Sequence, residues 1–189
     1  MNLAAAPSPD HRTAPSRLRL VLNVIAFQFG WFACVLGAAQ GWPLAGAALA
    51  LVIAVWHTAR AARPAQEAKL IVAAVLIGAA WDSSLAALGW LSFVSVITDA
   101  MAPPWILGLW ALFATTLNVS LNWLKGRWLV AALLGGIAGP LSYWAGARLG
   151  AVVLVEPVHA LVALSIGWAI LMPLLMALAR RYDGIHGTR

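Results

Sequence analysis

The stretch that decides the fold is LIVAAVLIGAAWDSSLAALGW, which runs from Leu70 to Trp90. Apart from Asp82 and the two serines after it, its residues are apolar or glycine. A helix of about 20 such residues is long enough to cross the roughly 30 Å hydrocarbon layer of a bilayer. A carboxylate inside that layer is costly, so Asp82 requires a partner or has a function. The stretch therefore predicts a membrane-spanning helix whose acidic side chain faces other protein rather than lipid.

The composition of the whole chain agrees with this prediction. Of its 189 residues, 63% are hydrophobic and 10% are charged, whereas soluble domains are about half apolar and a quarter charged. The 11 tryptophans suit the headgroup boundary of a membrane. The net charge of +6 does not indicate nucleic-acid binding, because the basic residues fall in short clusters between apolar runs. The single cysteine, Cys34, excludes an intrachain disulfide, and we expect it to be buried and inert.

Six apolar runs predict an all-α, polytopic membrane protein, with six transmembrane helices in residues 18–180. We expect a flexible cytoplasmic tail at residues 1–17 and a second cytoplasmic tail at 181–189. The second run covers only about 21 Å, so it must borrow flanking residues or cross a thinned region. The predicted spans are Leu18–Ala39, Leu44–His57, Leu70–Trp90, Pro104–Leu124, Trp128–Arg148 and Val158–Ala179.

The basic residues predict the orientation of these spans. If residue 1 lies in the cytoplasm, every lysine and arginine except Arg148 falls on the cytoplasmic side. The opposite threading would reverse that distribution and violate the positive-inside rule. We therefore expect both termini in the cytoplasm and a multi-pass arrangement in the membrane.

Polar residues within the spans form a candidate intramembrane site. Asp82 should face the bundle interior, either protonated or paired, and Arg148 is an obvious cation for it or for Asp99 or Glu156. The fourth span carries an amide and hydroxyl stripe on one helical face, which is either functional or interhelical glue. The predicted site residues are Asp82, Ser83, Thr115, Asn118, Asn122, Ser142, Tyr143 and Arg148.

The fifth span contains a predicted helix break at Gly136, Gly139 and Pro140. Proline cannot donate to the carbonyl four residues earlier, so the helix should kink or loosen there. The glycine pairs of this span allow a neighbouring helix to approach closely. An interrupted helix beside an intramembrane carboxylate is also how transporters build midplane sites.

The outer loops offer little chemistry. LSFVSVITDAMA and GAVVLVEPVHA are apolar for loops, so they are frayed helix ends or lie along or within the interface. Glu156 and His159 are too few ligands for a metal site, and we expect neither a metal nor a cofactor. The sequence contains no zinc-binding helix motif, nucleophile elbow, phosphate loop or paired-aspartate signature.

Four segments resemble a family of small bacterial inner-membrane proteins that is catalogued as a domain of unknown function. They are FQFGWFACVLGAAQG, WDSSLAALG, PPWILGLWALFATTLNVSLNWL and GPLSYWAGARLGAV, and the similarity runs from about Asn23 to Arg180. The resemblance implies a role in membrane-lipid metabolism or envelope stress, because members are encoded beside genes of cyclopropane-fatty-acid-type lipid modification. It assigns no catalytic residue.

Three functions stay open from the sequence. The first is a helper protein, expected not to be an enzyme, that binds membrane lipids, a membrane protein partner or a second copy of itself. The second is a small proton-coupled transporter that uses Asp82. The third is a membrane-embedded lipid-modifying enzyme with Asp82, or Glu156 with His159, as acid or base.

Overall fold

A computed structural model describes residues 16–94 and 101–186 of the chain. Within these ranges the fold is mostly helical, with six α-helices, a short 3₁₀ turn and two short strands. Residues 1–15, most of the expected first tail, lie outside the described part, and so does Asp99. The helices are α1 (Arg17–Ala39), α2 (Pro43–Ala59), α3 (Pro64–Ala87), α4 (Pro104–Leu117), α5 (Trp128–Arg148) and α6 (Pro157–Arg181).

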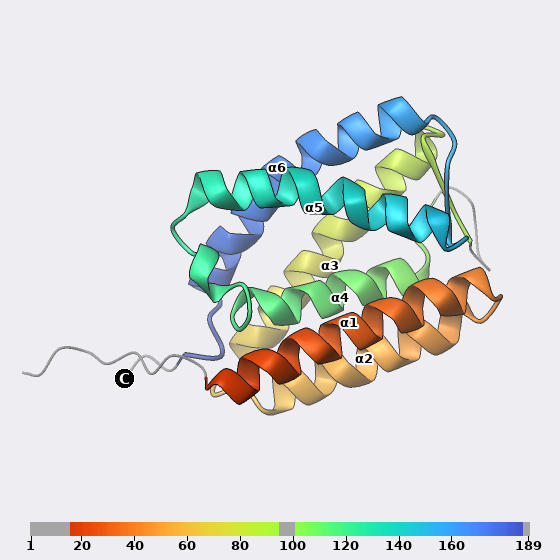
Figure 1. Cartoon of the computed structure of the whole chain (residues 1–189). Helices are drawn as coiled ribbons and strands as arrows, with labels where there is room; N and C mark the ends of the chain where they lie inside the picture. The colour runs from red at the N-terminus through yellow and green to blue at the C-terminus, as the bar shows by residue number, and fades with distance from the viewer. Residues whose placement is uncertain (1–15, 95–100, 187–189) are drawn as a thin grey trace, which may run out of the picture.

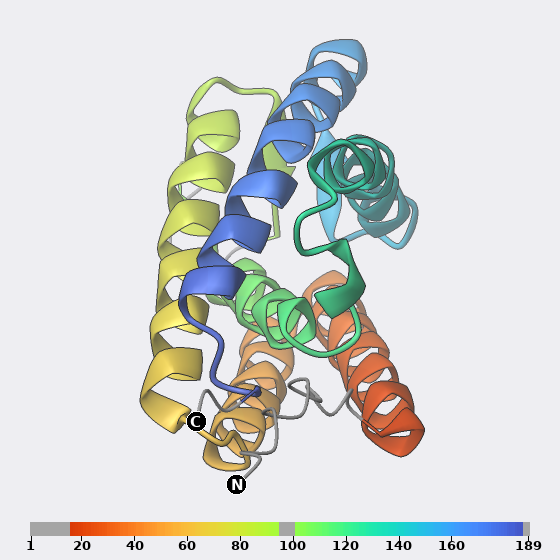
Figure 2. The same ribbon diagram turned by 90° about the vertical axis from the view of Figure 1, so that its left-hand side faces the viewer.

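Consecutive helices run in opposite directions between the same two ends of the bundle (Figure 1). The main packed pairs are α1 with α2 and α5 with α6, while α4 packs against α1, α2 and α3. In Figure 2, α4 lies at the centre with the other helices around it. Short connections explain the antiparallel pairs, since they leave consecutive helices side by side.

Proline starts four of these helices, at Pro43, Pro64, Pro104 and Pro157. Its fixed φ suits the first turn, where its missing N–H has no helical partner to lose. The residues ahead of the first two of these helices differ in conformation: Gly41 adopts a positive φ of 83° before α2, whereas Arg63 precedes α3 with a φ of −133° and a ψ of 81°. The sequence prediction that Pro104 begins the fourth helix is confirmed.

Four helices of the described ranges are long and apolar enough to cross a membrane: α1, α3, α5 and α6. The other two are shorter, with 17 residues in α2 and 14 in α4. Large apolar side chains cover the outside of the long helices. Leu76, Ile137 and Ile170 are 65%, 62% and 64% exposed, which is a surface suited to acyl chains rather than water.

The fourth predicted span is wrong at its end. Its helix stops at Leu117, and Asn122 begins the separate 3₁₀ turn η1 (Asn122–Leu124). Thr115, Asn118 and Asn122 therefore do not share one helical face. Asn118 occupies the C-cap position, where a short polar side chain competes with helix continuation by bonding elsewhere.

The expected helix break in the fifth span is also wrong. Helix α5 continues from Trp128 through Pro140 to Arg148. Its glycines serve packing instead, because a side chain at Gly135 would meet the backbone of Trp168 and one at Gly139 would meet its ring. This close contact holds α5 against α6.

Two outer connections form a small sheet, so the fold is not purely α-helical. Strand β1 (Leu91–Phe93) pairs antiparallel with β2 (Val152–Leu154), with Leu91 opposite Leu154. Both strands belong to the apolar loops that the sequence left as frayed ends or interfacial segments. Pairing satisfies their backbone N–H and C=O groups, which matters where little water is available.

Candidate functional site: an aromatic cleft backed by a buried carboxylate

Asp82 lies on α3 and is completely buried. The indole Nε1 of Trp110 donates to its Oδ2 at 2.7 Å, and the Tyr143 hydroxyl donates to its Oδ1 at 2.5 Å. These bonds join α3 to α4 and α5. Because an indole N–H only donates, Trp110 holds the carboxyl group in one orientation.

Glycines set the position of the rings around Asp82. The Trp110 indole lies directly on Gly78 of α3, where an added Cβ would sit 2.1 Å from a ring atom. Trp110 also stacks on Trp168 of α6, with ring centroids 4.9 Å apart and planes inclined by 10°. Small residues on α3 and α5 thus let two tryptophans from α4 and α6 meet in the bundle interior.

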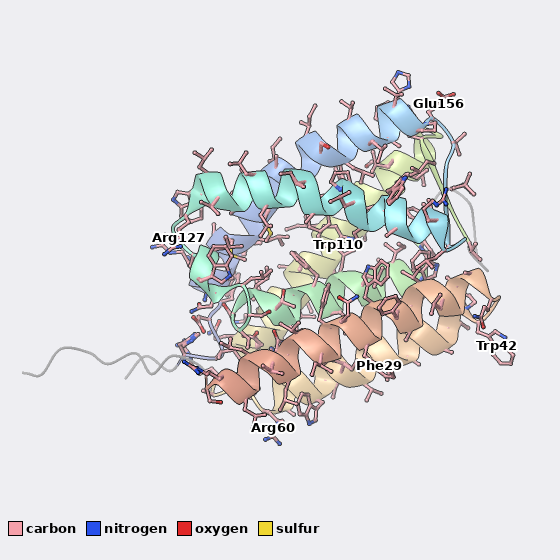
Figure 3. All side chains as sticks on the ribbon, in the orientation of Figure 1. Phe29, Trp42, Arg60, Trp110, Arg127 and Glu156 are labelled. Carbon is pink, nitrogen blue, oxygen red and sulfur yellow. The ribbon has the colours of Figure 1, made fainter. Side chains whose placement is uncertain are left out.

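A cleft of about 430 Å³ lies between α1 and α5, with α4 and α6 behind it. Its walls are mainly apolar, and seven aromatic side chains line it. Trp110 lies in the space between α4 and α5 (Figure 3). The exposed residues Gln28 and Ala138 belong to the lining and mark its mouth. The aromatic lining consists of Phe27, Trp31, Trp105, Trp110, Phe113 and Trp168 together with Tyr143.

The cleft contains few polar side chains: Gln28 of α1 at its mouth, and two neighbours on α5. Ser142 and Tyr143 both line it. The Ser142 Oγ accepts a hydrogen bond from Nε1 of Trp31 at 3.1 Å, which connects α5 to α1 across the cleft. The Tyr143 hydroxyl lies between the cleft and Asp82. An apolar space with a few convergent polar groups is the usual form of a small-molecule site.

The other predicted site residues are not part of this cleft. The Ser83 Oγ accepts from the backbone N–H of Ala102 at 3.0 Å and so fixes the chain ahead of α4. Thr115 bonds back to the carbonyl of Leu112 in its own helix. Arg148 does not pair with Asp82: it is exposed, and its guanidinium lies 6.0 Å from the Trp144 ring centroid. It extends from the last turn of α5, away from the face that carries Tyr143.

Glu156 and His159 form a loose, exposed pair with 3.7 Å between Oε2 and Nδ1. His159 also stacks on Trp90, with ring centroids 6.0 Å apart. Across residues 16–94 and 101–186, no three His, Cys, Asp or Glu side chains are grouped closely enough to hold a metal ion. These two residues therefore form an exposed surface contact, and no third such residue of the described ranges joins them as a metal ligand.

A second buried polar cluster surrounds Glu67, near the end of the bundle that carries Arg60 and Arg127, which we call the basic end. The sequence analysis did not predict this cluster. The Glu67 side chain is fully buried. His57 Nε2 lies 2.9 Å from its Oε1, while Asn118 Nδ2 and the Gly184 N–H donate to its Oε2 at 2.9 and 3.1 Å. Pro64 is the feature of the sequence that could have indicated the cluster. A proline there predicts that the helix begins ahead of Glu67, which places Glu67 in the first turn.

The segment after α6 folds onto this cluster instead of extending as a tail. Arg63 donates to the carbonyls of Asp183 and His186, and Lys125 lies 2.8 Å from Asp183. Burial alone would raise the pKa of Asp183, but the His186 N–H and Lys125 hold that pKa below its ordinary value. Residues 183–186 therefore close the basic end of the bundle.

Comparison with known proteins supports the resemblance seen in the sequence. The model of the family described as "Protein of unknown function (DUF2878)" matches residues 20–174. The chain belongs to this family. The match covers the described α1 to α5 and most of α6, including the cleft and Asp82. No curated protein and no solved structure matches the chain.

Proposed function

We propose that this family member binds a membrane lipid, holding an acyl chain in the cleft between α1 and α5. One observation carries the proposal: the cleft is apolar, lined by aromatic rings and open at Gln28 and Ala138. Its volume of about 430 Å³ is within the range of ligand pockets. The proposed activity is binding, as a helper to other membrane components, rather than catalysis.

The proposal includes six membrane crossings with the basic end in the cytoplasm of a bacterium. Arg60 and Arg127 lie at one end of the bundle, whereas Trp42 and Glu156 lie at the other (Figure 3). The alternating helix directions and the positive-inside rule support this placement. Helix α4 is buried along most of its length among its neighbours, so it can cross although it is short. Helix α2 carries exposed apolar residues such as Leu51 and Val52, a surface suited to acyl chains.

This placement supports a lipid acyl chain as the occupant, because the bilayer would surround the mouth of the cleft. The lining of α5 extends from Leu134 to Gly146, which is about 18 Å along the helix axis. The outer faces of α1 and α5 carry exposed apolar residues such as Phe29 and Ile137. An acyl chain therefore reaches the mouth from the bilayer without crossing water, whereas a polar solute would have to enter the hydrocarbon layer first.

Asp82 acts in this proposal as a positioning group for the wall of the cleft. It fixes Trp110 and Tyr143, and these two side chains line the cleft while Asp82 itself stays behind them. A lipid hydroxyl or ester then meets Tyr143 and Ser142. The carrier and enzyme hypotheses both require Asp82 to gain and lose a proton, whereas the positioning role does not. An Asp82→Asn variant distinguishes the two cases, because an amide can still position Trp110 and Tyr143 but cannot transfer a proton in this way.

The test is to fill the cleft without disturbing the bundle. Ala138→Trp places a large ring at the mouth, and Ala80→Trp places the same ring on an exposed position of α3 outside the cleft. Native mass spectrometry of the purified proteins then counts the lipid that stays bound after the detergent is removed. We expect wild type and Ala80→Trp to retain a lipid, and Ala138→Trp to retain at least about tenfold less.

Equal lipid retention by Ala138→Trp and Ala80→Trp would refute the proposal. Thermal unfolding of both variants in detergent serves as the control, since loss of lipid counts only if Ala138→Trp stays folded. Solute or proton flux in proteoliposomes that Ala138→Trp blocks would instead support the carrier hypothesis.

A further inference from the structure

We propose a second binding site, for the phosphate group of an anionic membrane lipid, at the basic end of the bundle. A cleft of about 350 Å³ lies there between the start of α1 and the end of α2. It shares no lining residue with the aromatic cleft. The proposal therefore stands independently of the acyl-chain site.

Two arginines give this cleft its charge. Arg19 from α1 and Arg60 from α2 both line it. Neither forms an ion pair with another residue of the described ranges. The Arg60 guanidinium lies 5.4 Å from the centroid of the Trp56 ring, which limits the orientations that it samples. Two cations that line one cleft and have no acidic partner in the described ranges favour an external anion.

His57 forms part of the same lining and is 8% exposed. Its Nε2 faces Glu67, and its Nδ1 makes no hydrogen bond within the described residues. Glu67 is in turn fixed by Asn118 and by the Gly184 N–H. The imidazole is thus a rigid wall of the cleft, held from behind by a buried carboxylate, rather than a side chain that swings away.

The rest of the lining indicates the class of ligand. Leu18, Leu22 and Ile53 also line the cleft and give it an apolar side. A free phosphate ion would gain nothing from contact with that apolar side, whereas a phospholipid would place its glycerol and first methylene groups against it. Guanidinium groups match phosphate oxygens in a bidentate geometry. Basic pockets between transmembrane helices on the cytoplasmic side are suited to anionic headgroups.

The site also lies at the depth that such a headgroup occupies. Arg19 lies within the first turn of α1 and Arg60 directly follows α2, so both are at the ends of their helices. Trp56, which is 50% exposed, lies one turn further in. Tryptophan below arginine is the order of side chains expected at a membrane boundary, where the ring contacts glycerol and the cation contacts phosphate.

The experiment compares charge-removing variants inside and outside the cleft. Arg19→Gln and Arg60→Gln remove its two cations. Arg127→Gln removes one at the same end of the bundle, where Arg127 lies over Trp123 outside this lining. Full-length protein in a neutral detergent is titrated with dioctanoyl phosphatidylglycerol, and bound lipid is counted by native mass spectrometry. Inorganic phosphate and an uncharged diacylglycerol with the same chains form the other two arms.

We expect each cleft variant to weaken phosphatidylglycerol binding by about fivefold, corresponding to about 1 kcal/mol per basic residue, and Arg127→Gln to match wild type. Equal weakening in all three variants would overturn the site in favour of diffuse surface charge. If diacylglycerol bound as tightly as phosphatidylglycerol, the claim that the site recognises a phosphate group would be wrong. If inorganic phosphate competed equally well, the claim that the phosphate belongs to a lipid would be wrong. Arg60→Lys is the second variant if Arg60→Gln does not fold: it keeps the charge, loses the bidentate fork and should still weaken binding.

The outcome is separable from that of the acyl-chain site. Ala138→Trp should leave phosphatidylglycerol titration at the basic cleft unchanged. If Ala138→Trp abolishes both kinds of binding, there is one lipid site and the second one is refuted. If only the arginine variants lose lipid, the basic cleft stands and the acyl-chain proposal fails.

Discussion

Replacing Tyr143 with Phe tests whether the buried contact with Asp82 stabilises the bundle. The change removes only the hydroxyl that donates to Asp82 Oδ1 at 2.5 Å and leaves the ring in the cleft wall. The Asp82 side chain is fully buried and keeps one donor, Trp110, so Oδ1 loses its partner. The variant should therefore unfold more easily than wild type.

The size of the effect follows from two ranges. Hydrogen bonds to charged groups in soluble proteins contribute about 1.5–3 kcal/mol. Interhelical hydrogen bonds in membranes average about 0.6 kcal/mol and reach about 1.7. Complete burial and a short distance place this bond near the top of the membrane range, so we expect a loss of about 1.5 kcal/mol, or roughly tenfold in the unfolding equilibrium.

The assay is reversible unfolding in mixed micelles, followed by circular dichroism, with Tyr182→Phe as the matched control. Tyr182 is the other tyrosine of the chain, and its hydroxyl makes no hydrogen bond within the described residues. A double-mutant cycle with Asp82→Asn then isolates the coupling between the two side chains. If Tyr143→Phe loses no more stability than Tyr182→Phe, or if the cycle shows no coupling, the reasoning about this contact is refuted.

Three further predictions concern packing, the Glu67 cluster and pH. Gly78→Ala should destabilise the bundle by about 1–3 kcal/mol because its Cβ would collide with the Trp110 ring, whereas Gly146→Ala meets its nearest atom at 3.5 Å and should be close to neutral; equal melting temperatures would contradict this. Glu67→Ala should lose about 3 kcal/mol in the same unfolding assay because three polar groups around it lose their acceptor, and a loss below about 1 kcal/mol would contradict the cluster. Because the pKa of Asp183 is lowered from 3.8, its contact with Lys125 should stabilise the C-terminal segment above that pH, and this stabilisation should be lost as the pH falls through the lowered value. The measurement is the protection of amides in that segment relative to their intrinsic exchange rate at each pH, and protection that decreases above pH 3.8 would be the wrong sign.

The sequence was sufficient for the number and order of the helices. A hydrophobic run indicates contact with lipid, and a proline indicates where a helix can begin, because it lacks a backbone N–H. Both are local properties of the chain. The inward position of Asp82 followed from the cost of exposing a carboxylate to hydrocarbon. Its partners did not follow, because Trp110 and Tyr143 are far from it in the chain and neither carries a charge. Charge complementarity pointed to Arg148, yet the helical rotation between Tyr143 and Arg148 places that arginine on another face.

The other errors also arise from long-range contacts. Gly136, Gly139 and Pro140 indicated a break because glycine and proline weaken an isolated helix, but packing against α6 supports this one. Asn118 seemed to continue a helical stripe, whereas its amide bonds with Glu67 and the Tyr182 carbonyl and caps the helix. A single sequence holds no record of those distant partners.

We propose that all six helices cross the membrane, including the short helices α2 and α4, so that lipid surrounds the bundle and the mouth of the aromatic cleft. Single cysteines introduced at Gln40, Ala62, Met101 and Arg127 flank these two helices, in a Cys34→Ser background. Labelling of spheroplasts with a membrane-impermeant maleimide tests each position. We expect the cysteines at 40 and 101 to label from outside, and those at 62 and 127 to label only after the membrane is permeabilised. If 40 and 62, or 101 and 127, label from the same side, the helix between them does not cross and the six-span arrangement is wrong.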